Sequence, residues 1–417
     1  MRVRWRHGLA AVIAAALLLP LTGHQGGKAA QQNQTKPAPP AKPPAQIKPK
    51  PPAPQPLPSP GAALDTAAKH ALILEVETGT VLFKKYADER MPPASMSKIM
   101  TAYVVFGMLK NGQAKLTDEL TVSQKAWKLG GSKMFVGVGG HITIENLVQG
   151  MLVQSGNDAC VVLAEGLAST EAGFVDLMNE QAAAIGLKNS HFANVTGLPD
   201  PNEWMTAEDL ATLAVRIIRD FPEYYHYFSE KEFNFNNIDQ ANRNPLLYRN
   251  IGADGLKTGH TDEAGFSLTA SVVRGDRRVI LVVSGLSSMK DRATESERLI
   301  EWAFREFNDY KLFNAGDKVD DAEVWLGTEP KVGLTIGGDL TITLPRRVRR
   351  DMKVKISYNG PIPAPVKKGD EIGKLIVSAP DVEPIVRPLF AASNVPAIGT
   401  FGRMATLAAY LIWGGRH

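Results

Sequence analysis

A serine and a lysine three residues apart are the pair whose types and spacing best fit catalysis. Ser95 and Lys98 stand in the segment PPASMSKIMTAY, and residues three apart share one face of a helix. A serine hydroxyl is a poor nucleophile until a base takes its proton. A lysine can be that base only if burial or a neighbouring cation lowers the pKa of its ammonium group. Positive potential at the helix N-terminus would stabilise anionic intermediates. The pair therefore predicts acyl transfer through Ser95.

This spacing alone is weak evidence, because about two chance matches are expected in a chain of this length. Ser287 and Lys290 also match it. The downstream sequence distinguishes the two candidates, because two further short motifs lie after the first pair and nothing comparable lies after the second. These motifs are Ser155-Gly156-Asn157 and Lys257-Thr258-Gly259. Each also has a purely structural interpretation, as a helix cap and as the end of an ordinary strand.

In this order, S-x-x-K, S-x-N and K-T-G resemble the motif set of penicillin-binding proteins and serine β-lactamases. The segments PPASMSKIMTAY, LVQSGNDAC and GLKTGHTDEAG look like those of low-molecular-mass D-alanyl-D-alanine carboxypeptidases, serine peptidase family S11. The similarity covers roughly residues 65–390. It implies a hydrolase that removes the terminal D-alanine from peptidoglycan pentapeptides through an acyl-enzyme. It also implies inhibition by β-lactams and no cofactor or metal.

The resemblance assigns roles to the motif residues. Ser95 would attack the carbonyl between the two terminal D-alanines while Lys98 takes its proton. Ser155 and Asn157 would position the lysine and the substrate. Lys257 would add positive charge near Lys98 and help to keep that lysine neutral by repulsion.

Substrate-binding roles are also implied by the resemblance. Thr258, which precedes Gly259, would hydrogen-bond the substrate carboxylate. The backbone N–H groups of the nucleophile and of His260 would form the oxyanion hole. Arg292, in SSMKDRATE, resembles the arginine that binds the terminal carboxylate, and Arg243 competes for that role.

Two other functions stay open. A β-lactamase would share the Ser–Lys pair, although the E-x-x-L-N pattern of class A enzymes is absent. Asp200 and Glu203 lie between the second and third motifs, so slow hydrolysis of a penicilloyl-enzyme is not excluded. A catalytically silent envelope protein would form no covalent penicillin adduct. Cys160 lies one turn after Asn157 on an apolar helix, so we expect it to be buried rather than nucleophilic.

The secondary-structure pattern predicts an α+β fold, an antiparallel sheet covered by helices, as in β-lactamases and transpeptidases. Hairpins are expected at 71–86 and at 266–285, and the nucleophile should begin a helix over Ser95 to about Leu109. Further helical stretches are expected at 144–168, 172–186 and 206–219. Thr294 and Glu297 form a candidate capping box for a last helix.

Short alternating runs at 334–344, 352–358 and 372–378, broken by Gly and Pro, predict a small all-β domain. We assign 64–312 to the catalytic domain and 313–390 to this β domain. The β domain has no evident catalytic set, so it should serve for spacing or docking.

Residues 1–29 are typical of a signal peptide, with Arg2, Arg4 and Arg6 before an apolar run at 9–21. An uncleaved membrane anchor is the alternative. Residues 30–63 are a proline-rich linker that favours extended polyproline II; it is a plain spacer or a ligand for a proline-binding domain. The chain should therefore be exported to the periplasmic face of the cytoplasmic membrane.

The tail, 391–417, places apolar residues of 401–413 at helical spacing. It is too short to span a bilayer and apolar enough to bind a membrane surface. Packing on its own domain is the alternative.

The composition of the chain bears on nucleic-acid partners, disulfides and metal sites. The net charge of +4 comes partly from the leader and linker, so it gives no reason to expect a nucleic-acid partner. A single cysteine excludes an intrachain disulfide, and the eight histidines form no metal-ligand pattern.

Overall fold

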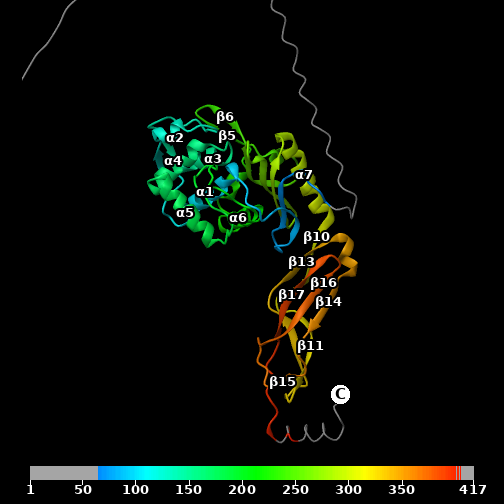
Figure 1. The fold of residues 1–417 in the computed structure, drawn as a ribbon. Coiled ribbons are helices and arrows are strands. Elements are labelled where there is room, and N and C mark those ends of the chain that lie inside the picture. The colour runs from blue at the N-terminus through cyan, green and yellow to red at the C-terminus, as the bar shows by residue number, and fades with distance from the viewer. Residues whose placement is uncertain (1–63, 401, 403, 405–417) are drawn as a thin grey trace, which may run out of the picture. The chain divides into compact units, whose positions relative to one another are not determined.

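The computed structural model describes residues 64–400, 402 and 404. The predicted signal peptide, the linker and most of the predicted membrane-binding tail lie outside these residues. The described chain forms a helix-covered sheet followed by an all-β region (Figure 1). None of its helices is long and apolar enough to cross a membrane.

A five-stranded antiparallel sheet forms the centre of the first region. Its strands are in the order β2-β1-β9-β8-β7. Both predicted hairpins are present in it, so these predictions are confirmed. The strands are β1 (His70–Glu75), β2 (Val81–Lys85), β7 (Ala253–Thr261), β8 (Gly265–Arg274) and β9 (Arg277–Leu286).

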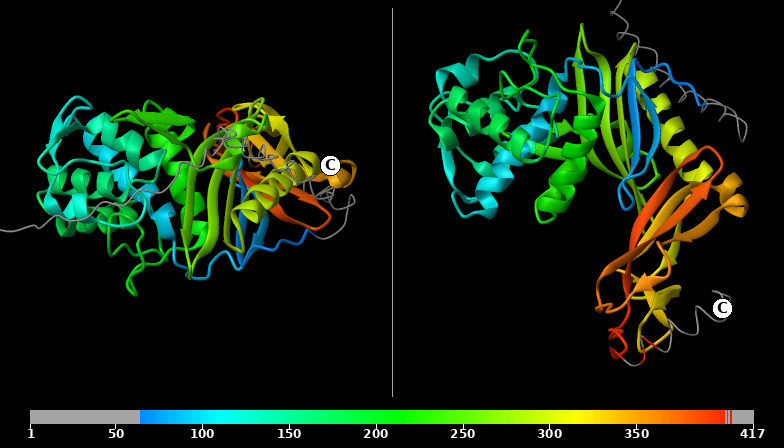
Figure 2. Two further views of the ribbon diagram at one scale, coloured as in Figure 1. Left: turned by 90° about the horizontal axis from the view of Figure 1, so that it is seen from above. Right: turned by 60° about the horizontal axis from the view of Figure 1, so that its bottom comes forward.

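Helices cover both faces of this sheet (Figure 2). One face packs on α7, where Ile73 of β1 lies in a core with Leu299 and Ala303. The other face packs on the larger helical group, where the neighbouring Leu72 joins a separate core. Successive strand side chains point to opposite faces, so β1 serves both cores. The helices are α1 (Lys98–Lys110), α2 (Gln124–Lys128), α3 (Ile144–Leu152), α4 (Asn157–Ala168), α5 (Glu171–Ala184), α6 (Ala207–Asp220) and α7 (Met289–Glu306).

Short elements connect these helices and strands. They are η1 (Ala94–Ser97), β3 (Glu119–Thr121), β4 (His141–Thr143), η2 (Tyr225–Ser229), β5 (Glu232–Phe235), β6 (Ile238–Ala241) and η3 (Pro245–Tyr248).

Two predictions about helices were wrong in detail. The stretch predicted at 144–168 is two helices, because Ser155 adopts a left-handed backbone with φ of 67° between α3 and α4. Helix α7 begins earlier than the Thr294 capping box requires. Ser288 caps it by accepting a hydrogen bond from the Asp291 N–H, and the Thr294 hydroxyl instead donates to the Lys290 carbonyl.

The all-β region contains a six-stranded sheet in the order β14-β16-β17-β12-β11-β15 and a separate β10–β13 pair. Its core includes Leu334, Leu375 and Leu389. The strand pairing begins at Phe307, ahead of the boundary at 313 expected from sequence. The elements are β10 (Phe307–Phe313), β11 (Lys318–Trp325), β12 (Lys331–Ile336), β13 (Leu340–Pro345), η4 (Arg346–Asp351), β14 (Lys353–Ser357), β15 (Ile362–Pro363), β16 (Glu371–Ala379) and β17 (Val382–Ala391).

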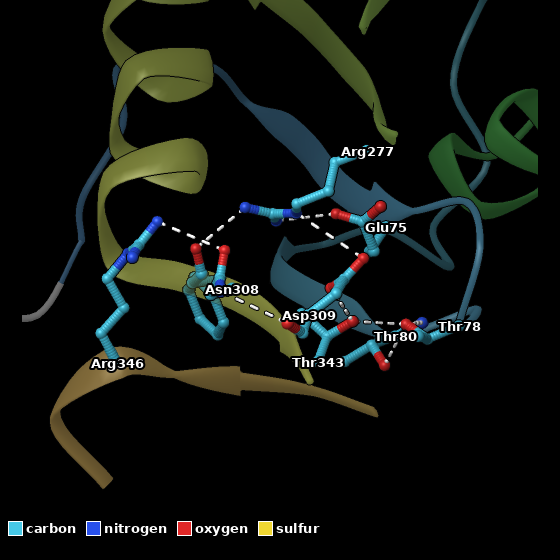
Figure 3. A network of polar contacts seen from close by, with 9 residues as sticks. Glu75, Thr78, Thr80, Arg277, Asn308, Asp309, Thr343 and Arg346 are labelled. Carbon is cyan, nitrogen blue, oxygen red and sulfur yellow. Dashed lines mark hydrogen bonds and ion pairs between the residues drawn. The ribbon is translucent and has the colours of Figure 1, made fainter. Parts of the chain in front are cut away.

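A network of polar contacts joins β10 and β13 to the first sheet (Figure 3). The Arg277 guanidinium donates to Glu75 at 2.8 Å and lies 3.6 Å from an Asp309 oxygen. The hydroxyls of Thr78 and Thr343 lie 2.5 Å apart, and Thr343 donates to Asp309 at 2.7 Å. We call Glu75, Arg277 and Asp309 the junction cluster.

Candidate active site

The nucleophile lies where the 3₁₀ turn η1 passes into α1. Lys98, the first residue of α1, is completely buried, whereas Ser95 is partly exposed. The Lys98 Nζ lies 2.9 Å from the Ser95 Oγ, 2.8 Å from the Asn157 Oδ1 and 2.5 Å from the Thr196 carbonyl oxygen. Three acceptors therefore surround the three donor positions of an ammonium group. The predicted Ser–Lys pair is in direct contact.

The second motif, Ser155-Gly156-Asn157, lies at the start of α4 and forms another side of the site. The left-handed turn at Ser155 lets Asn157 begin a new helix with its side chain directed at Lys98. The Asn157 amide nitrogen donates to the Gly130 carbonyl at 3.0 Å, which fixes the orientation of this side chain. The Ser155 Oγ is buried and has no hydrogen-bond partner within 64–400. Its hydroxyl is therefore available to Lys98 or to a bound group.

The third motif lies on β7, the edge strand of the sheet. Lys257 is 2% exposed, and its Nζ lies 3.3 Å from the Thr258 carbonyl oxygen. A Cβ on Gly259 would lie 3.0 Å from the Pro93 carbonyl and 3.1 Å from the Ala94 Cβ. Glycine thus lets β7 pass close to η1 and the nucleophile. The His260 side chain is exposed, with its ring 3.9 Å from that of Phe266.

Burial sets the electrostatics of the two lysines. It lowers the pKa of Lys98, and the positive charge of Arg243 lowers it further. The pKa of Lys257 is lowered strongly, first by burial and then by the charge of Lys98. Burial, rather than repulsion alone, is therefore the main reason why the neutral amine that a general base needs is accessible.

Two arginines lie near one another on the same side of the site. Arg292 is buried on α7, its Nη2 lies 3.4 Å from the Arg243 carbonyl, and its Nε has no hydrogen-bond partner among the described residues. Burial, then the charge of Arg243, lowers the pKa of Arg292 to about 10. Arg243 has an exposed side chain and donates to the Ser132 Oγ at 2.6 Å. Arg243 is thus the more accessible of the two predicted anion-binding residues.

The sequence motifs missed one part of the site, the turn at 193–198. Thr196 holds Lys98 through a backbone carbonyl, and a backbone group leaves no signature in side-chain motifs. Glu203 lies behind this turn with an exposure of 6%. In the sequence, only its position between two motifs marks it.

Cys160 is completely buried, and its thiol donates to the Gly156 carbonyl at 3.2 Å. Burial raises the pKa of this thiol to about 11, which suppresses the nucleophilic thiolate. Within the described residues, no three His, Cys, Asp or Glu side chains are grouped so as to hold a metal ion.

An open cavity of about 450 Å³ adjoins the nucleophile. Ala94 and Gly197 line it on one side and Thr261 of β7 on another. The cavity therefore lies next to the nucleophile, between the turn at 193–198 and the end of β7.

Comparison with known proteins identifies both regions. Residues 57–288 match the peptidase S11 family, D-alanyl-D-alanine carboxypeptidase, and residues 307–397 match the C-terminal domain of penicillin-binding protein 5. The chain is 39% identical to D-alanyl-D-alanine carboxypeptidase DacC of Escherichia coli (strain K12) over 345 residues, 81% of this chain and 86% of that protein. It is 36% identical to DacA of the same strain, with the same coverage.

Solved structures agree with these matches. Penicillin-binding protein 5 from Haemophilus influenzae superposes with a TM-score of 0.72 at 36% identity, covering 80% of this chain and 99% of that one. Penicillin-binding protein D2 from Listeria monocytogenes, in its ampicillin-bound form, gives 0.54 at 30% identity, covering 58% and 99%.

Proposed function

Because this chain belongs to the D-alanyl-D-alanine carboxypeptidases of peptidase family S11, we propose that Ser95 is the residue acylated in its reaction. The protein is a serine-type D-alanyl-D-alanine carboxypeptidase of the penicillin-binding type, which acts on peptidoglycan peptides and binds β-lactams. The observation that carries the assignment of Ser95 is its 2.9 Å contact with the buried Lys98.

Neutral Lys98 takes the proton of the Ser95 hydroxyl as Oγ attacks the carbonyl carbon between the two D-alanines. The C–N bond then breaks, the leaving amine takes a proton, and an ester to Ser95 remains. Water hydrolyses this ester and regenerates the serine. Asn157 and Ser155 hold Lys98 and the substrate in place, and general-base help of this kind contributes about 10²- to 10⁴-fold.

The remaining roles concern substrate binding. The backbone N–H groups of Ser95 and His260 would stabilise the oxyanion, each worth roughly 10²- to 10³-fold. Thr258, next to Gly259 and Lys257 on β7, would bind the terminal carboxylate. Arg292 and Arg243 lie close together, so we assign the carboxylate to this arginine pair, with the exposed Arg243 in direct contact and Arg292 adding charge behind it.

A penicillin adduct tests the nucleophile. Intact-mass spectrometry after penicillin treatment should show one penicilloyl group on the wild type and none on Ser95→Ala. Ser287→Ala is the matched control, because Ser287 and Lys290 have the same spacing; this variant should keep the adduct. An adduct that persists in Ser95→Ala would overturn the assignment.

Release of D-alanine from a pentapeptide distinguishes the carboxypeptidase from the two other functions. We expect wild-type protein to release D-alanine and to hydrolyse penicillin only slowly. Rapid penicillin turnover without D-alanine release would instead indicate a β-lactamase. Absence of both an adduct and turnover would indicate the silent envelope protein.

We further propose that the chain is exported and attaches to the periplasmic face of the cytoplasmic membrane through its tail; the start of the tail expected at 391 was too early, because Ala391 and Val395 lie in the core of the β domain. The support is sequence pattern: a signal-like leader, and apolar residues at helical spacing in 401–413 with Arg403 and Arg416 as charges. Deletion of residues 399–417, which keeps the buried Val395 of the β domain, should move the protein from the membrane pellet to the supernatant. Continued pelleting would contradict the role of the tail.

A further inference from the structure

Glu203 is a buried carboxyl group close to the Ser–Lys pair, and no motif includes it. One carboxylate oxygen accepts hydrogen bonds from the backbone N–H of Ala193 at 3.4 Å and of Asn194 at 3.1 Å, and from the Asn194 side-chain amide at 2.6 Å. The Ser97 hydroxyl, which is completely buried, also stabilises the ionised carboxylate by a side-chain hydrogen bond. Burial of an ionisable carboxyl group costs stability even when the group accepts hydrogen bonds. Its presence beside a catalytic lysine therefore points to a function.

Hydrogen bonds of Asn194 connect Glu203 to the turn at 193–198. The Asn194 Oδ1 accepts hydrogen bonds from the Thr196 N–H at 3.0 Å, the Thr196 hydroxyl at 2.6 Å and the Gly197 N–H at 2.8 Å. The Asn194 amide also donates to the Leu198 carbonyl at 3.0 Å. Because Glu203 accepts from both the backbone and the side chain of Asn194, it fixes the residue around which the turn is built.

The turn has two contacts with the reacting groups. The Thr196 carbonyl oxygen lies 2.5 Å from the Lys98 Nζ. A Cβ on Gly197, whose φ is 74°, would lie 1.9 Å from the Ala94 carbonyl oxygen, so only glycine lets the turn press against the chain next to Ser95. A small displacement of this turn would move the base relative to the nucleophile, and misplacement by about 1 Å can cost on the order of 10²-fold in rate.

Glu203 also acts on Lys98 through its charge. Burial is the main influence on the pKa of Lys98 and lowers it, whereas the negative form of Glu203 raises it and Asp158 on α4 acts in the same direction. The positive charge of Arg243 acts in the opposite direction. Burial raises the pKa of Glu203 to about 7, while the Ser97 hydroxyl and the two N–H groups of the turn lower it.

Other charged groups lie around the turn. The Glu171 carboxylate on α5 accepts from the Val195 N–H at 3.4 Å and forms an ion pair with Lys125. Arg90, Asp200 and Glu263 line the mouth of the cavity that Glu203 borders, and all three are exposed to solvent. Solvent screens exposed charges more than buried ones, so Glu203 is the carboxylate of this cavity with the strongest effect on Lys98.

We propose that Glu203 is a positioning residue for Lys98: through Asn194 it fixes the carbonyl group that orients the lysine, and its negative charge opposes loss of the lysine proton. The inference rests on the proposed function, in which Lys98 is the base. It assigns Glu203 two separable effects, one on the rate of acylation and one on the pH at which acylation begins.

The two effects are separated by the second-order rate of acylation by a fluorescent penicillin, measured against pH. Glu203→Gln keeps the shape of the side chain and an acceptor oxygen for the turn but removes the charge. Above about pH 7, where Glu203 of the wild type is ionised, Lys98 of the variant should lose its proton more readily, so the acid limb in that range moves to lower pH by roughly one unit. Glu203→Asp keeps the charge but withdraws the carboxylate from Asn194. It should lower the plateau rate about 10-fold or more while the acid limb stays in place.

Glu263→Gln is the matched control, because it removes a carboxylate from the same cavity that is exposed and makes no contact with Asn194. Its profile should superimpose on that of the wild type. An unmoved acid limb in Glu203→Gln would overturn the charge effect, and a wild-type plateau in Glu203→Asp would overturn the positioning effect. If Glu203→Gln does not fold, as judged by its melting temperature, Glu203→Asp still tests positioning. If Ser95 is not the nucleophile, acylation persists in Ser95→Ala, which separates failure of the proposed function from failure of this inference.

Discussion

The active site and the junction cluster both bury charge, but they arrange it in opposite ways. In the junction cluster the single cation, Arg277, lies between two carboxylates, with Glu75 at 2.8 Å and Asp309 at 3.6 Å (Figure 3). In the active site two lysines, Lys98 and Lys257, are buried together. The carboxyl group with the largest effect on the pKa of Lys98, that of Glu203, is also buried.

The contrast shows what each arrangement achieves. In the junction cluster, the cation between two carboxylates holds β10 against the first sheet. Separation of the two segments would leave buried charges without their partners. In the active site, burial lowers the pKa of both lysines and makes a neutral amine accessible to the reaction. We therefore expect substitutions in the active site to reduce activity more than stability. Substitutions in the junction cluster should do the reverse.

Replacement of Lys98 gives the largest expected effect. Lys98→Met should lower the acylation rate by about 10²- to 10⁴-fold, because it removes the base. Its melting temperature should fall less than that of a variant at Arg277, because the variant leaves two neutral acceptors, the Asn157 Oδ1 and the Thr196 carbonyl, without a donor rather than two carboxylates without a cation. Stopped-flow acylation and thermal unfolding of the same preparation provide the two measurements. A large loss of stability would show that Lys98 holds the fold as Arg277 does.

Replacement of Arg277 should have the opposite result. Arg277→Met leaves Glu75 and Asp309 without their shared cation, and this should lower the free energy of unfolding by about 3–5 kcal/mol. The acylation rate of the folded protein should not change, which denaturant unfolding and penicillin binding can check together. Arg347→Met is the control: its pair with Asp381 is solvent-exposed, so its loss should cost about 0–1 kcal/mol.

The smallest expected effect is a change in how stability depends on pH. Burial is the main reason why the pKa of Glu75 rises to about 7, with the charge of Asp309 raising it and Arg277 lowering it. The protonated carboxyl is thus favoured in the native state, so its contribution is full below about pH 4.3 and is lost as the pH rises through 7. Glu75→Gln should therefore lose less stability than the wild type between pH 5 and pH 8. Parallel curves from urea unfolding would contradict this assignment.

Features that depend on residues close together in the chain, or on the type of a side chain, could be predicted from the sequence. Hairpins at β1–β2 and β8–β9 followed from alternating apolar residues. The contact between Ser95 and Lys98 followed from helical spacing. Their proximity to Asn157 was an expectation from family resemblance, because 59 residues separate Lys98 from Asn157 and no local pattern encodes that contact.

The features that the sequence did not predict depend on backbone geometry or on long-range pairing. The break between α3 and α4 depends on a left-handed serine, a conformation that the residue type does not signal. The Thr196 carbonyl makes its contact through an atom that every residue has. Glu75 and Arg277 are 202 positions apart, so their pairing could be found only once the sheet had been formed.

Cys160, the sole cysteine of the chain, is fully buried with its thiol protonated. Maleimides should therefore leave the native protein unlabelled, and a cysteine introduced on the surface would be its one reactive attachment point. A spectroscopic probe could then be placed on either side of β10 without first removing a native thiol. A second introduced cysteine would place a probe on the other side of β10 as well, so that the distance between the two regions, and any change in it when penicillin binds, becomes measurable without removal of Cys160.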